Sequence, residues 1–113
     1  MKSRRLIWGF VAAASVVALS AASASRAEEK KHLSAGQTKA IPCMGCHAIP
    51  GYSNVYPTYH VPKVGGQHAE YIIAALKAYR SGERHHPTMQ AQASTLSDED
   101  IADIAAFFAT KKP

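Results

Sequence analysis

Two cysteines are the most constraining feature of this sequence. They are its only ones, and they stand in one short motif, Cys43-Met44-Gly45-Cys46-His47. A small single domain has little hydrophobic core, and such domains commonly depend on disulfides, a metal or a cofactor. One cysteine pair excludes a scaffold of several disulfides. The fold is therefore expected to be organised around whatever this motif binds.

The spacing C-x-x-C-H is the attachment signature of c-type haem. The two thiols can add to the two vinyl groups of the porphyrin, and His47 can then bind the iron. Three other chemistries use the same residues. A redox dithiol is typical of a thioredoxin-like βαβ pattern, which the sequence lacks. A zinc site needs four ligands, and His85 and His86 are adjacent rather than spaced. A plain disulfide leaves His47 without a role. We predict one haem c, covalently bound through Cys43 and Cys46.

The first 27 residues have the organisation of a cleavable export signal. Lys2, Arg4 and Arg5 make a basic start, residues 6–22 carry no charge, and small residues lead to Ala27. The segment Ala22-Ser23-Ala24 is a competing cleavage site. An uncleaved membrane anchor is the alternative, but Ala, Ser and Gly dilute the apolar run.

We therefore expect residues 1–27 to be a signal peptide and residues 28–113 to form one domain in the periplasm, because covalent haem is attached outside the cytoplasm. Four of the thirteen Lys and Arg lie in the predicted signal, so residues 28–113 carry nine basic and eight acidic residues. This near balance gives no argument for nucleic-acid binding. A nucleotide-binding α/β enzyme with two halves does not fit in a domain of this size.

The remaining sequence favours helices. Ser34 and Gln37 match a capping box, which predicts a first helix from Ser34 to about Ile41, because Pro42 disfavours helical geometry just before it. Apolar residues at helical spacing predict a second helix that ends at Gly82: Ile72, Ala75, Leu76 and Tyr79.

Ser97 is the predicted N-cap of a last helix, with acidic residues in its first turn and a buried stripe that includes Ile101, Ile104 and Phe108. Residues 48–66 and 83–95 show no clear strand alternation and are predicted to be irregular loops. The second of these loops holds Met89. The pattern as a whole predicts an all-α domain.

A six-coordinate haem needs a second axial ligand opposite His47. Met44 lies between the two cysteines and cannot reach the other face. Met89 stands among Pro, Thr, Gln and Ala rather than on a helical stripe, which favours it over an ordinary core methionine. The alternative ligands are five histidines: His32, His60, His68, His85 and His86.

These motifs together resemble the class I cytochrome c family, of the small bacterial periplasmic type, and are similar to the single-haem unit of bacterial di-haem cytochromes c. The similar segments are residues 35–37, 43–47, 62–67, 79–84, 96–101 and 104–108. The resemblance implies the class I cytochrome c fold, with three to four helices packed around one covalently bound haem. In that family the ligand Met lies seven residues before the Leu of a Leu-Ser-Asp segment, as Met89 lies before Leu96.

The resemblance also implies roles for other residues. Pro62 matches the proline whose carbonyl accepts a hydrogen bond from the proximal histidine, here His47. Gly36 and Phe107 match the contact where the first and last helices cross. Tyr71 and Arg84 match positions near the haem edge or its propionates, although a helix-face Tyr and a solvated Arg explain them equally well.

Three departures from the family are visible. Pro42 directly precedes the first Cys, so the first helix is expected to end early. Gln92 stands where the family often has a second Met, three residues after the ligand. The loop 48–61 is longer than in near relatives and is rich in Tyr and His.

The function implied is a one-electron carrier rather than an enzyme, because protein ligands fill both axial positions of the iron. Its partners would be redox proteins: a quinol-oxidising complex, a dehydrogenase, a terminal oxidase or a reductase. No nucleic acid is expected, and a membrane only through partner complexes. Two alternatives stay open: a haem-bearing subunit of a periplasmic dehydrogenase, and a haem peroxidase with a labile Met89.

Overall fold

The computed structural model describes residues 6–112, and the side chains of residues 21–112. Lys2, Arg4 and Arg5, the basic start of the predicted signal, lie outside the described residues. The chain divides into two compact units, one up to Lys31 and one from His32 onward. Within the described part of the chain, no helix is both long and apolar enough to cross a membrane.

Helix α1 (Leu6–Lys39) begins in the first unit and ends in the second. The prediction that Ser34 caps the start of this helix is wrong, because the helix runs through it. Residues 10–33 contain many Ala and neither Gly nor Pro, so nothing in that stretch stops a helix. The helix ends at Lys39, close to the predicted end. Helix α2 (Ile41–His47) follows, with Pro42 in its first turn, where a proline is tolerated.

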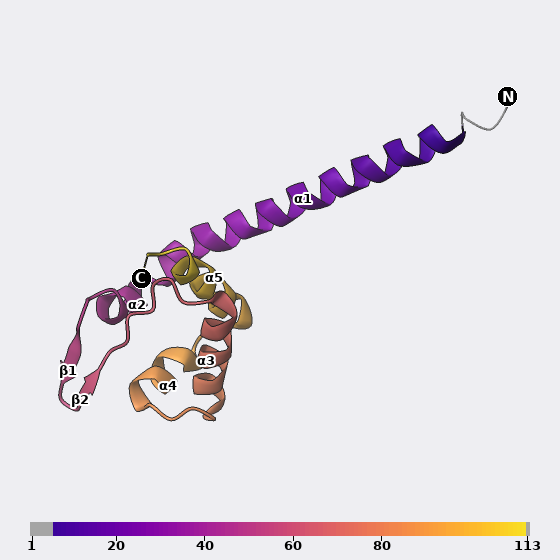
Figure 1. The fold of residues 1–113 in the computed structure, drawn as a ribbon. Helices are drawn as coiled ribbons and strands as arrows, with labels where there is room; N and C mark the ends of the chain where they lie inside the picture. Colours follow the sequence, from indigo (N-terminus) through magenta and orange to yellow (C-terminus); the bar gives the residue numbers. More distant parts are fainter. Residues whose placement is uncertain (1–5, 113) are drawn as a thin grey trace. The chain divides into compact units, whose positions relative to one another are not determined.

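The second unit is built on three further helices, α3 (Ala69–Ser81), α4 (Pro87–Ser94) and α5 (Asp98–Ala109). Helix α3 packs against both α4 and α5 (Figure 1). Two predicted helix boundaries are confirmed. Gly82 ends α3 in the left-handed conformation, with φ 84°, and Ser97 caps α5 in a capping box with Asp100. The apolar core is made by Ala40, Ile72, Leu76, Ala93, Ile101, Ile104, Ala105, Phe107 and Phe108.

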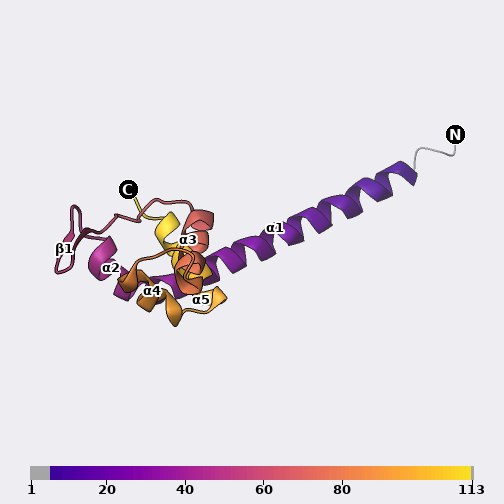
Figure 2. The ribbon, with the colours of Figure 1, turned by 90° about the horizontal axis from the view of Figure 1, so that it is seen from below.

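Both predicted loops contain regular structure. Strand β1 (Ser53–Val55) pairs antiparallel with β2 (Thr58–His60), and this hairpin lies beside α2 at the edge of the unit in both views (Figures 1 and 2). The strands have three residues each, too short for an alternation to show in the sequence. Helix α4 occupies the other predicted loop. This helix buries only Ala93, so its sequence has no apolar stripe from which a helix could be predicted.

The end of α1 and the helix α5 cross at Gly36. A Cβ atom at this position would lie 2.0 Å from the backbone oxygen of Asp103 and 2.8 Å from Cβ of Phe107. Only a glycine lets the two backbones approach so closely. The predicted contact of Gly36 with Phe107 is confirmed.

A charged network lies at the same crossing. Asp103 is only 2 % exposed and is bonded to the His32 ring and to Lys39 Nζ, the latter at 2.5 Å. Lys39 also pairs with Asp100 at 2.8 Å. Hydrogen bonds to Asp100 and Asp103 raise the pKa of Lys39, and the Lys39 ammonium lowers the pKa of Asp100. Burial opposes ionisation of Asp103, but the hydrogen bonds from Lys39 and His32 outweigh it, and its pKa is lowered.

Acid is expected to destabilise the fold through this network. Carboxyl groups whose pKa is lower in the folded state stabilise it above their unfolded pKa, about 3.9, and that stability is lost as the pH falls further. Guanidinium unfolding of the haem protein at pH 3 and pH 6 measures the difference. Asp103→Asn should make it smaller, while Glu70→Gln, an exposed carboxyl on α3, should leave it as in the parent. If the free energy of unfolding differed between pH 3 and pH 6 by the same amount in Asp103→Asn as in the parent, this account would be contradicted.

Arg80 joins α3 to the start of α5. Its guanidinium donates to the Leu96 carbonyl oxygen at 2.8 Å and to Asp98 Oδ1 at 2.5 Å. Lys77, one turn earlier on α3, donates to the other Asp98 oxygen at 3.2 Å. Hydrogen bonds from Arg80 and Lys77 lower the pKa of Asp98. The two ends of the segment that carries α4 are therefore held together independently of α4 itself.

Candidate haem site

Helix α2 presents the cysteine motif. Cys43 and Cys46 are free thiols, three residues apart and therefore on the same face of the helix. Cys43 is half-buried and packs against the apolar core, whereas Cys46 is exposed. Burial raises the pKa of the Cys43 thiol. Two thiols on one helical face suit attachment to one rigid ring at two points.

His47 is the last residue of α2, and its ring is oriented by a single backbone contact. Nδ1 lies 2.6 Å from the carbonyl oxygen of Pro62. A carbonyl oxygen can only accept, so Nδ1 carries the proton and donates it. The lone pair of the neutral ring is then on Nε2, the atom available to bind a metal. The structure thus contains the hydrogen bond that the family resemblance implied.

Met89 lies in the first turn of α4, not in a loop as the sequence suggested. Its backbone N–H donates to His86 Nδ1 at 3.4 Å, which caps the helix. The Met89 side chain is half-buried and packs against the same core cluster as Cys43. Helices α2 and α4 therefore bring the Cys43 thiol and the Met89 thioether to one apolar cluster.

Several apolar side chains around this cluster are only partly buried: Met44, Val64, Ala69, Ile73, Tyr79 and Leu96. A flat apolar group bound there would cover them. The two thiols could attach the porphyrin through its vinyl groups, and an imidazole with its proton fixed on Nδ1 and a thioether are donors that fit haem iron. The zinc alternative finds no support, because residues 21–112 contain no group of three or more His, Cys, Asp or Glu placed to hold a metal ion.

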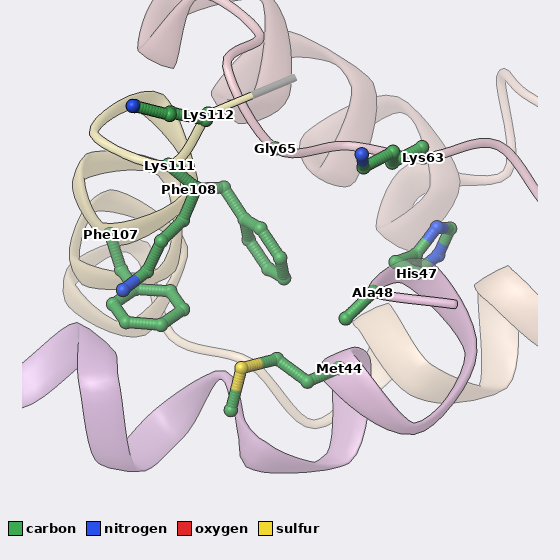
Figure 3. Close-up of a pocket in the computed structure, with 9 residues that line it drawn as sticks. All are labelled: Met44, His47, Ala48, Lys63, Gly65, Phe107, Phe108, Lys111 and Lys112. Atoms are coloured by element: carbon green, nitrogen blue, oxygen red, sulfur yellow. The ribbon is translucent and has the colours of Figure 1, made fainter. Parts of the chain in front are cut away.

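A pocket of about 170 Å³ borders His47 on the side of α5. In Figure 3 the Phe108 ring points into the space between α5 and α2, and Met44 faces it from α2. Lysine side chains stand around it, and the Lys111 ammonium lies 4.2 Å from the centre of the Phe107 ring. Apolar side chains thus border the imidazole on this side.

Other candidates have partners of their own. Among the alternative histidine ligands, His32 is bonded to Asp103, and His60 Nδ1 lies 2.7 Å from Ser53 Oγ. The Arg84 guanidinium donates to the Tyr71 hydroxyl at 3.4 Å, and this hydrogen bond raises the pKa of Arg84. Arg84 and Tyr71, two positions matched to the haem edge, are therefore brought together.

Sequence reasoning missed one group of residues at this site. Tyr59, His86 and Thr88 meet beside Met89: the Tyr59 hydroxyl lies 3.0 Å from Thr88 Oγ1, and the Tyr59 and His86 rings stand edge-to-face at 4.6 Å. The only signal in the sequence was the high Tyr and His content of residues 48–61. Because the hairpin was not predicted, there was no reason to place Tyr59 near α4.

Comparison with known proteins decides the family. Residues 34–112 match the cytochrome c family. The chain belongs to that family. It is 40% identical over 78 residues to cytochrome c4 of Pseudomonas aeruginosa, an alignment that covers 69% of this chain and 37% of that protein. It is 41% identical over 81 residues to cytochrome c-554(548) of Halomonas halodenitrificans, covering 69% and 94% respectively.

A third relative is a protein of Thiomonas intermedia named thiosulfate dehydrogenase electron acceptor. It is 27% identical over 79 residues, which cover 70% of this chain and 36% of that protein. The chain therefore spans little more than a third of cytochrome c4 but nearly all of cytochrome c-554(548).

Family membership confirms the central sequence predictions. The protein has the class I cytochrome c fold and resembles one unit of a c4-type cytochrome. It carries haem c, covalently bound through Cys43 and Cys46. Its relatives in this family are cytochromes, and one is named as an electron acceptor.

Proposed function

We propose that this cytochrome is a periplasmic mono-haem carrier that accepts and donates one electron at a time, with the iron held between His47 and Met89. The ligand assignment rests mainly on one observation, that Cys43 and Met89 pack against the same apolar cluster. In addition, His47, the residue after Cys46, donates its Nδ1 proton to the Pro62 carbonyl oxygen, which leaves Nε2 available for the iron.

The bound haem supplies a one-electron Fe(III)/Fe(II) couple. His47 offers Nε2 to the iron, and its hydrogen bond to Pro62 orients the ring and makes it a stronger donor. A thioether from Met89 favours the reduced state and raises the potential relative to two histidines. The apolar side chains of the cluster exclude water. Because His47 and Met89 would both bind the iron, no site would be left on it for oxygen or peroxide, which favours a carrier over a peroxidase.

The ligand assignment predicts a spectroscopic loss in Met89→Ala. Thioether ligation of ferric haem gives a weak far-red charge-transfer band that bis-histidine haem lacks. Met89→Ala should abolish this band, lower the reduction potential and let small ligands bind the iron. Met44→Ala is the matched control, because Met44 packs on the same core but lies between the two cysteines. A parent without the band, with a spectrum that changes in His86→Ala, would point to a histidine ligand instead.

Export is the second part of the proposal, and it rests on the order of basic, apolar and small-residue segments in residues 1–27. Mass spectrometry of the native protein is expected to find a mature N-terminus at Glu28, in the soluble periplasmic fraction. A start at Ser25 would indicate cleavage after Ala24. A membrane-bound form that retains Trp8 would contradict cleavage and support an anchor.

The redox partner is proposed by chemistry. Residues 28–113 are almost balanced in charge, so long-range electrostatic steering is weak, which suits a near-neutral partner or a lasting complex. The name of the Thiomonas relative supports a dehydrogenase as donor. A quinol-oxidising complex is the other donor class, and a terminal oxidase or reductase is the acceptor. Purification of the native protein with whatever accompanies it distinguishes a free carrier from a dehydrogenase subunit.

A further inference from the structure

The β1–β2 hairpin has little core of its own. An isolated two-stranded hairpin is marginally stable in water. At its tip Val55 is 87% exposed and Tyr56 is 93% exposed. Local hydrogen bonds close it, such as Val61 N–H to the Tyr52 carbonyl at 2.9 Å and Asn54 Nδ2 to the Pro57 carbonyl at 2.8 Å. These bonds shape the hairpin but do not tie it to the rest of the domain.

Tyr59 makes that tie. It is the one half-buried residue of β2, and its hydroxyl lies 3.0 Å from Thr88 Oγ1. Its ring meets the His86 ring edge-to-face, with centroids 4.6 Å apart. The tie therefore joins β2 to two residues of the chain that stand on either side of Pro87.

Both residues, His86 and Thr88, are next to Met89, one by a hydrogen bond and the other along the chain. Thr88 precedes it in the chain, and His86 Nδ1 accepts a hydrogen bond from its backbone N–H at 3.4 Å. Tyr59 thus contacts the residue that caps α4 and the residue next to Met89. Beyond this first turn, Ala93 is the one buried residue of α4.

We propose that Tyr59 is a positioning residue for the axial ligand: through Thr88 and His86 it holds the first turn of α4 so that the Met89 sulfur stays on the iron. This inference rests on the proposed ligation by Met89. Tyr59 itself binds neither haem nor substrate. Its effect is to make the ligand-bound arrangement of α4 more populated than a displaced one.

Imidazole binding to the ferric protein is the test, because added imidazole must displace Met89 to reach the iron. Tyr59→Phe removes the hydroxyl but keeps the ring, and Tyr59→Ala removes both contacts. One hydrogen bond is worth about 0.5–1.5 kcal/mol net, so Tyr59→Phe should raise the imidazole affinity roughly two- to thirteenfold. Tyr59→Ala should raise it further. Thr88→Val should match Tyr59→Phe, and the double variant should add little, because both remove the same bond.

The control is Tyr56→Phe, on the exposed tip of the same hairpin, which should bind imidazole like the parent. Thr110→Val is a second control, because it removes a comparable hydroxyl bond, from Thr110 to the Phe107 carbonyl oxygen at 2.8 Å, at the end of α5. It should lower the unfolding temperature about as much as Tyr59→Phe but bind imidazole like the parent, which separates positioning from general stability. If the parent shows the far-red band but Tyr59→Phe binds imidazole like Tyr56→Phe, the positioning role is overturned and the carrier proposal stands. A gain in imidazole affinity in Thr110→Val equal to that in Tyr59→Phe also overturns it. A parent without the band overturns both.

Discussion

A chain with both Cys43→Ala and Cys46→Ala is expected to lose its haem to acid-acetone and to be largely unfolded, while the parent keeps its haem through the same extraction. Each single substitution should prevent normal maturation. The reason is the size of the core, which consists of nine buried apolar residues. Further apolar side chains, Cys43 and Met89 among them, are only partly buried against this core. We expect haem to bury them further. A small domain that loses such a group loses much of its core.

The control for this experiment is Gly45→Ala. A Cβ at Gly45 meets no atom of the chain within 4 Å, and both thiols are left in place. This variant should mature and retain haem like the parent. Circular dichroism of the cysteine-free chain gives the second measurement. A well-folded helical spectrum without haem would show that the protein core is sufficient by itself.

Gly36→Ala is expected to destabilise the haem protein strongly. The added methyl would stand 2.0 Å from the Asp103 backbone oxygen, and backbone cannot turn aside as a flexible side chain can. The end of α1 and α5 must therefore separate. Overpacking of this kind typically costs about 1–3 kcal/mol. For a domain of 60–100 residues, each kcal/mol lowers Tm by roughly 4–8 °C.

Gly45→Ala is again the matched comparison, because it makes the same substitution in a helix with open space around it. A helical alanine is favoured over glycine by roughly 0.5–1 kcal/mol, so Gly45→Ala should leave Tm unchanged or raise it. Opposite effects of the two variants would isolate the close approach at Gly36 as the cause. An unchanged Tm in Gly36→Ala would show that the crossing is looser than the structure describes.

The features that the sequence predicted well depend on chemistry close along the chain. Ser97 and Asp100 form a capping box wherever they stand three apart at a helix start, and Gly82 adopts a conformation that few other residues tolerate. The haem motif is equally local, since five consecutive residues carry both thiols and the proximal imidazole. Each of these was readable from a short window.

The features that were missed depend on what lies further away. Ser34 has the side chain of an N-cap, but an uninterrupted Ala-rich stretch before it carries the helix through. Helix α4 lacks an apolar stripe, because only Ala93 faces the core and Tyr59 contacts its start from another segment. No local pattern reports a contact between residues 29 positions apart.

The bridge from Arg80 to Leu96 and Asp98 has a consequence for how such a protein can change over evolutionary time. Because α3 and α5 are joined directly, the two ends of the segment between them stay together when its length changes, and Ala93 is its one residue in the buried core. Doubling a loop costs only about 0.6 kcal/mol of closure entropy. Mutations that change the length or the side chains of the segment between Gly82 and Thr95 can therefore be tolerated without a change in the packing of α3 against α5. Under the proposed ligation by Met89, the reduction potential can then change through this segment while the α3–α5 pair stays the same.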